Sequence, residues 1–209
     1  MEDSPSSMQD RQASGAAAGI DARIARRVRS LRADLGMTLD ALSRCSRVSR
    51  SMLSLVERGE SSPTATVLEK IASGLGVSLA TLFEDAGAPS HPLSRGRERS
   101  TWRDPQSGYL RRNISPVNFP SPIQIVEVTL PAGARVAYEG DARAVSIHQQ
   151  IWVRQGRIEV TVGTVIWRLE TDDCLAMRLD APVTYRNRSR SQARYIVVIT
   201  SERPRSVAR

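Results

Sequence analysis

Apolar residues recur at helical spacing through the first third of the chain. Ile24, Val28, Leu31 and Leu35 follow one another at intervals of four, three and four residues, which predicts the buried face of an amphipathic helix ending at Gly36. A polar residue suited to an N-cap precedes each later apolar cluster, so the pattern predicts a compact bundle of five short helices. The four further helices are expected to open at Thr38, Ser49, Ser62 and Ser78.

The apolar period changes to two in the second half of the chain. Alternating or β-branched runs, separated by turn residues such as Gly156 and Gly163, are typical of short strands. The predicted strands cover 122–130, 147–153, 158–162, 164–169, 174–179 and 195–200. Six or more strands at this spacing predict a small antiparallel β-sandwich or barrel.

These patterns divide the chain into four segments. Residues 1–19 are rich in Ser, Ala, Gly and Gln without large apolar periodicity, and they are predicted to form a disordered tail. Residues 20–85 form the all-α domain. Residues 86–105, with Pro, Gly, Ser and charge, read as a linker to an all-β domain over 106–203.

The charge of the chain indicates a polyanionic partner. Its 209 residues carry a formal net charge of +8, and residues 22–58 hold nine arginines against Asp34, Asp40 and Glu57. Every basic residue except Lys70 is arginine, which suits bidentate contacts to phosphate and guanine. A general bias toward arginine explains the excess equally well, so both interpretations stay open here.

Composition also argues against several protein classes. Two cysteines cannot build a disulfide scaffold or a zinc finger, and two histidines argue against a metal enzyme with histidine ligands. No apolar run approaches the roughly 18–20 residues of a membrane helix, and the first residues lack the pattern of a signal peptide. We expect a cytoplasmic protein without membrane association.

The segment 37–85 resembles the helix-turn-helix domains of the phage-repressor and Cro class, the XRE family, at polar as well as apolar positions. The resemblance implies a five-helix, lambda-repressor-like domain that binds a double-stranded DNA operator, with the helix 49–58 in the major groove. It implies DNA contacts by Thr38, Leu39, Ser49, Arg50, Ser51, Ser54 and Arg58. Arg50 is the expected base reader, because its planar fork matches the O6 and N7 atoms of guanine.

Other positions of this segment carry structural expectations. The resemblance implies that Glu57 pairs with Arg32 on the first helix rather than facing DNA. Arg47 stands at a turn position where the family prefers glycine, so a strained or altered turn is expected. Cys45 is expected to be a core residue, with a redox switch as the alternative. Leu55 either packs or contacts a thymine methyl group.

The segment 148–200 resembles the cupin small barrel, and specifically the sensor half of repressor–cupin fusions. The resemblance rests on Gly156, the hairpin 156–163, the turn at Asp172 and Asp173, Pro182 and Asn187. It implies an all-β cupin domain, a small antiparallel barrel or jelly roll, that forms a homodimer and binds a small-molecule effector.

The metal ligands of enzymatic cupins have no counterparts here. The expected ligand positions fall on Gln149, within 142–145 and on Val183, and none of these positions holds a histidine or a glutamate. We therefore expect no metal, no cofactor and no catalytic residues.

A ligand pocket is nevertheless expected at the mouth of the barrel. Alternation and cupin register place Gln149, Ile151, Tyr185 and Asn187 on inward faces, with His148 and Arg178 near the rim. The alternative is a filled barrel in which Tyr185 and Asn187 only satisfy each other.

Together these expectations describe a transcriptional regulator, a repressor, that reads an operator as a homodimer and responds to an effector. The alternatives are a cupin enzyme tethered to DNA and an effector-independent, structural DNA-binding dimer.

Overall fold

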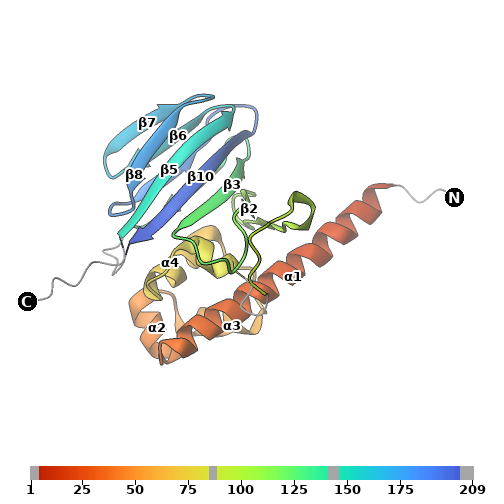
Figure 1. Ribbon diagram of the computed structural model, residues 1–209, viewed down its shortest axis with the longest axis vertical. Coiled ribbons are helices and arrows are strands. Elements are labelled where there is room, and N and C mark those ends of the chain that lie inside the picture. The colour runs from red at the N-terminus through yellow and green to blue at the C-terminus, as the bar shows by residue number, and fades with distance from the viewer. Residues whose placement is uncertain (1–4, 85–88, 141–145, 203–209) are drawn as a thin grey trace, which may run out of the picture.

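The computed structural model describes residues 5–84, 89–140 and 146–202. Helices at one end of the molecule pack against a β-sandwich, with the helix of residues 65–74 lying next to the strands (Figure 1). The helical elements are α1 (Pro5–Asp34), α2 (Leu39–Ser46), α3 (Arg50–Arg58), α4 (Ala65–Gly74) and the 3₁₀ helices η1 (Leu79–Phe83) and η2 (Gly96–Glu98).

Side-chain caps set the starts of the short helices. The side-chain oxygens of Thr38, Ser49 and Ser78 accept hydrogen bonds from the backbone amides three residues later, as N-caps do. The fourth helix starts later than predicted, because Thr64 rather than Ser62 caps it. The fifth predicted helix is the single 3₁₀ segment η1, so the described part of the first domain has four α-helices rather than five.

Helix α1 differs from the sequence prediction at both ends. It begins at Pro5 and occupies most of the segment predicted to be disordered. That segment contains Ala, Gln, Met and Arg, all good helix formers, so helix propensity favours the backward extension of the helix. At the other end, Leu35 lies past the last helical residue and is exposed, whereas Ile24 and Val28 are buried as expected.

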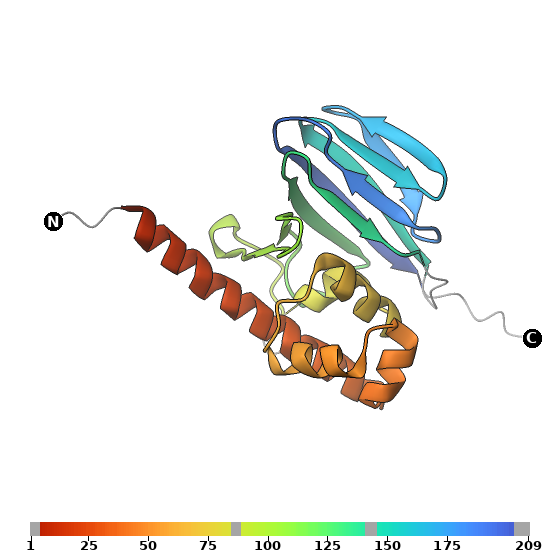
Figure 2. The ribbon, with the colours of Figure 1, turned by 180° about the vertical axis from the view of Figure 1, so that it is seen from behind.

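The second domain is a sandwich of two antiparallel sheets (Figure 2). The described strands pair in the orders β1-β2-β3-β10-β5-β8 and β4-β9-β6-β7. Their bounds are β1 (Thr101–Arg103), β2 (Leu110–Asn113), β3 (Ile123–Leu130), β4 (Arg135–Tyr138), β5 (Ser146–Gln155), β6 (Ile158–Val162), β7 (Val165–Leu169), β8 (Cys174–Arg178), β9 (Val183–Arg186) and β10 (Ala193–Glu202). The two-sheet form agrees with the predicted sandwich, whereas hydrogen bonding among these strands does not close a barrel.

The β domain also begins earlier than predicted. Strand β1 lies inside the expected linker 86–105, where Trp102 is almost fully buried against the first domain. Its ring meets the ring of Phe83 edge-on at a centroid distance of 5.5 Å. Asp104 accepts a hydrogen bond of 2.8 Å from the amide of Ala65, in the first turn of α4. The segment therefore docks the two domains instead of separating them.

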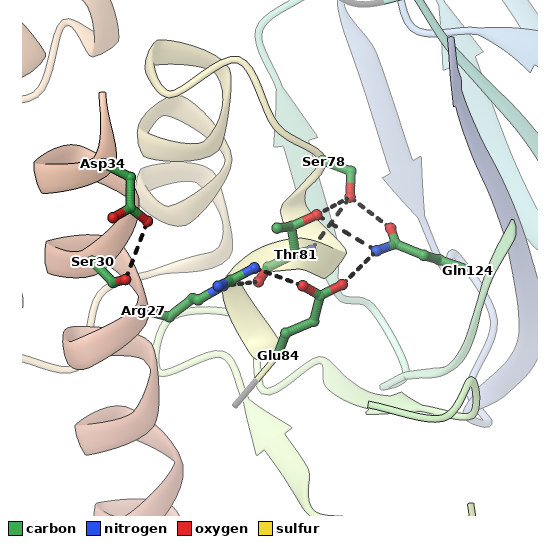
Figure 3. Close-up of polar contacts among 7 residues, drawn as sticks. All are labelled: Arg27, Ser30, Asp34, Ser78, Thr81, Glu84 and Gln124. Atoms are coloured by element: carbon green, nitrogen blue, oxygen red, sulfur yellow. Dashed lines mark hydrogen bonds and ion pairs between the residues drawn. The ribbon is translucent and has the colours of Figure 1, made fainter. Parts of the chain in front are cut away.

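A polar network between α1, the residues flanking η1 and β3 also holds the two domains together (Figure 3). Gln124 of β3 accepts a hydrogen bond of 2.6 Å from Ser78 and donates one of 3.0 Å to Glu84. The same glutamate receives Arg27 of α1 at 2.8 Å, and Arg27 also donates to the carbonyl oxygen of Thr81 at 3.2 Å. Burial raises the pKa of Glu84, although Arg27 and Gln124 oppose the shift.

In the part of the chain that the structure describes, none of the helices is long and apolar enough to span a lipid bilayer.

Candidate DNA interface and candidate ligand cavity

Helix α3 has one buried face and one exposed face. Leu53 and Val56 pack into the core of the first domain. Ser49, Arg50, Ser51 and Arg58 are exposed, and Ser54 is half-buried. Of the two expected residues at the start of α2, Thr38 is exposed and Leu39 is half-buried and packs against the core. The predicted contact residues thus occur on α3 and at the start of α2, the arrangement that a helix-turn-helix presents to a major groove.

Arg50, the expected base reader, lies close to an acidic residue of the preceding helix. Its Nε atom is 3.2 Å from a carboxylate oxygen of Asp40, and both side chains are largely exposed. An exposed ion pair of this kind contributes little stability and exchanges easily for a phosphate or a base edge. Arg50 is therefore held at the exposed side of α3 but remains available.

Arg58 is held by its own neighbours at the end of α3. It donates to the hydroxyl of Ser54 and forms an ion pair of 2.7 Å with Glu60. The hydrogen bond between them raises the pKa of Arg58 and lowers the pKa of Glu60. Two of the expected DNA-contacting side chains, Ser54 and Arg58, are thus joined to each other.

Glu57 is 6% exposed and faces α1 rather than solvent. Its two carboxylate oxygens accept hydrogen bonds from Nε and Nη2 of Arg32 at 2.6 and 2.7 Å, and these bonds raise the pKa of Arg32. Arg29 donates to the backbone carbonyl oxygen of Glu57 at 2.7 Å. The predicted structural role of Glu57 is found.

Two further expectations for this domain have different outcomes. Arg47 adopts the left-handed conformation, with φ of 56°, at the turn between α2 and α3, as expected for a position that favours glycine. Cys45 is exposed, so its predicted place in the core is wrong. The inward positions of this short helix are taken by Leu42 and Ser46.

A cavity lies inside the sandwich, with about 690 Å³ of empty space when its open mouth is included. Gln149 and Tyr185, two of the predicted pocket residues, line it, and the Tyr185 hydroxyl donates to Oε1 of Gln149 at 3.1 Å. Tyr138 and Tyr195 line it as well. Burial raises the pKa of all three tyrosines well above the usual value, so their hydroxyls stay protonated at neutral pH.

The other four predicted pocket residues are not part of this lining. Ile151 is fully buried in the core. The Asn187 amide donates to the carbonyl oxygens of Leu130 and Ser191 and accepts from Ser189, so it holds loops together. His148 and Arg178 are exposed and lie opposite each other on β5 and β8, one residue out of phase with Gln149. They face away from the cavity for that reason.

Sequence reasoning missed the part of the cavity wall that comes from β2 and from the first domain. Tyr109 and Arg111 line the cavity from the β2 region, and Glu69, Ser78 and Leu79 line it from α4 and η1. Little in the sequence indicated that β2 lines a cavity, because this strand is short and rich in charged residues.

Among the described residues there is no group of three or more His, Cys, Asp or Glu side chains that could hold a metal ion. The segment 142–145, where the cupin histidine pair was expected, lies outside the described residues. Its sequence contains no histidine.

Comparison with known proteins finds matches to the first domain. The HTH_3 helix-turn-helix family matches residues 28–82. The HTH-type transcriptional regulator SutR of Escherichia coli (strain K12) is 43% identical over 56 residues, which are 27% of this chain and 32% of SutR. The chain thus matches about a third of the length of this curated relative.

A solved structure is similar across both domains. The crystal structure of an HTH_3 family transcriptional regulator from Vibrio cholerae is 28% identical, covers 89% of this chain and 99% of its own, and has a TM-score of 0.71. These matches confirm a helix-turn-helix domain over residues 28–82, and the two-sheet antiparallel topology of the second domain agrees with the fold expected from its resemblance to cupins.

Proposed function

We propose that the protein is a sequence-specific, DNA-binding transcriptional repressor that acts in the cytoplasm. The observation that carries the proposal is the exposed polar face of α3, which holds Ser49, Arg50, Ser51 and Arg58 in a domain of the helix-turn-helix family. Arg50 reads a guanine in each half-site, and Ser49, Ser51 and Ser54 face the DNA beside it. Thr38, Leu39 and Arg58 position the helix on the phosphate backbone.

Genome-wide footprinting of the protein tests this function. The proposal predicts discrete protected sites that share a sequence, and binding to them lowers transcription of the neighbouring genes. Protection spread evenly over the genome would show a DNA-binding protein without an operator, and raised transcription at the sites would show an activator.

The second part of the proposal is a homodimer formed through the cupin domain. A single helix-turn-helix domain contacts few base pairs, so operator specificity calls for two. Strand β7 ends its sheet and exposes Val165, Ile166 and Trp167, while Trp152 of β5 is also exposed. Apolar side chains on a terminal strand suit burial against a second copy.

Light scattering tests the dimer. The full-length chain should have the mass of two protomers, and Trp167→Glu should shift it toward one. Phe119→Glu changes an aromatic residue of similar exposure outside the terminal strand, so it is the matched control and should leave the dimer intact. A monomeric full-length chain would contradict this part of the proposal.

The third part is regulation by an effector in the cupin cavity. Because α4 and η1 contribute to its wall, a ligand that prefers one arrangement of the domains shifts the population of the state that binds DNA.

An enzyme tethered to DNA is the second candidate function, and an effector-independent structural dimer is the third. Metal analysis with turnover assays on the purified protein tests the enzyme. Thermal-shift screening against metabolites separates the structural dimer from a sensor, since only a sensor gains stability from a ligand.

A further inference from the structure

Arg111 is a buried cation that forms no ion pair with any carboxylate among the described residues. It lies on the inner side of β2, is 5% exposed, and lines the cavity together with Tyr109. Its Nη1 atom donates to the hydroxyl of Tyr109 at 3.4 Å, and its Cζ atom lies 5.1 Å from the centre of the Phe83 ring. Its Nε and Nη2 atoms have no hydrogen-bond acceptor among the described residues.

This arrangement is costly unless an acceptor is supplied. A guanidinium stays protonated in proteins, so Arg111 cannot escape the cost of burial by becoming neutral. A buried charge is normally compensated by an opposite charge and by hydrogen bonds to its remaining donors. Here the aromatic ring of Phe83 and one long hydrogen bond are the partners that the structure gives it.

The rest of the cavity indicates what kind of acceptor fits. Apolar side chains such as Val128, Val136 and Leu179 form much of the wall, and the protonated hydroxyl of Tyr185 adds a polar group. Arg111 is the one cation among the described lining residues, and two carboxylates, Glu69 and Glu139, line the cavity as well. Glu139 pairs with Lys70 at 2.8 Å. The unmatched guanidinium beside apolar walls suits a ligand with one compact anionic group on an apolar body. A carboxylate matches the guanidinium fork in shape and charge.

We propose that this cavity binds a small organic carboxylate whose anionic group pairs with Arg111. Nε and Nη2 are covered by neighbouring side chains, so pairing involves a turn of the guanidinium away from the Phe83 ring and toward the cavity. The ligand body then lies against the apolar wall.

The position of the site gives the ligand a route to the DNA-binding domain. Phe83, from which the guanidinium turns, belongs to η1, and Ser78 and Leu79 of the same region line the cavity. Carboxylate binding therefore changes contacts between the two domains. This regulatory consequence rests on the proposed function, whereas the binding itself does not.

Isothermal titration calorimetry on the full-length protein, without DNA, tests the proposal. The probes are acetate, butyrate and hexanoate, their neutral amides as shape-matched controls, and inorganic phosphate. At least one carboxylate should bind tenfold or more tightly than its amide and more tightly than phosphate. In Arg111→Met that preference should disappear, and the melting temperature should not fall, because the variant removes an uncompensated charge.

Arg112→Met is the matched control for Arg111→Met. Arg112 is the next residue of β2, but it pairs with Glu127 on the other side of the sheet, so its loss should leave the preference for carboxylate unchanged. The proposal is overturned if no carboxylate binds, if the amides or phosphate bind as tightly, or if Arg111→Met keeps the preference. The comparison of acid with amide on the unaltered chain decides the matter even where a variant does not fold. None of these results requires a loss of DNA binding. A failure of the carboxylate proposal can therefore be told apart from a failure of the proposed function.

Discussion

Arg32 of α1 and Glu57 of α3 form a two-bond ion pair in which Nε and Nη2 of the arginine meet the two carboxylate oxygens at 2.6 and 2.7 Å. The pair ties the expected recognition helix to the helix behind it. It also keeps a carboxylate away from the exposed face of α3, where it would repel phosphate. A single contact thus serves both the stability of the domain and the charge of its DNA-facing side.

Replacing Glu57 tests that role. Glu57→Ala leaves Arg32 largely buried without its carboxylate, and we expect the free energy of unfolding to fall by about 2–4 kcal/mol in chemical denaturation. Glu60→Ala, which breaks the exposed pair with Arg58, is the control and should lower stability far less, because solvent screens an exposed ion pair. Equal effects of the two variants, or a changed DNA sequence preference in Glu57→Ala, would contradict the structural role.

Arg50→Ala should weaken operator binding by about 1–3 kcal/mol and relax the preference at one base pair in each half-site, because the guanine contact is lost. Titrations on the operator and on single-base variants measure both effects. Arg97→Ala removes an equally charged, exposed residue outside the helix-turn-helix and should change neither. If affinity for operator and random DNA falls by the same factor, Arg50 contacts phosphate only.

Asp40→Asn should have the opposite effect on affinity. The substitution removes a negative charge beside the DNA-facing side of α3 and releases Arg50 from its ion pair. Binding to operator and random DNA should tighten by roughly threefold at low salt, with a smaller gain at high salt because screening weakens the charge effect. Unchanged binding at low salt would show that Asp40 does not compete with DNA for Arg50.

The docking contact at Glu84 predicts a pH dependence. Its pKa is raised in the folded protein, mainly by burial, so the folded state binds the proton more tightly than the unfolded state. Its contribution to stability is therefore fully present below the unfolded pKa and is lost as pH rises through the higher folded pKa. In Glu84→Gln, the dependence of the unfolding free energy on pH across this interval should be flatter than in the unaltered chain. An identical profile would show that Glu84 does not titrate as described.

Periodic patterns predicted the elements that carry strong local signals. The caps Thr38, Ser49 and Ser78 and the six apolar strands were readable because short-range chemistry determines them. Cys45 was misplaced because an eight-residue helix buries only a narrow stripe, and a shift of one residue decides which side chains occupy it: Ser46 is buried and Cys45 is exposed.

The cavity was harder to predict, because residues far apart in sequence form it. Asn187 was predicted to line the pocket. In the structure its side-chain amide instead donates to two backbone carbonyl oxygens and accepts from a serine hydroxyl, contacts that the sequence does not reveal. Arg111, which stands in a short, charge-rich strand, was not singled out from the sequence, and the structure shows that it is buried. Docking of α4 and η1 against the sandwich could not be inferred from either domain alone.

Selection of binding sites from a random DNA pool by the full-length protein, with light scattering of the resulting complex, tests the central claim most directly. The account predicts an enriched pseudo-palindrome, with half-sites about 34–36 Å apart or a multiple of that distance, bound by two protomers. An unenriched pool, or a single half-site bound by one protomer, would contradict a dimeric, sequence-reading regulator.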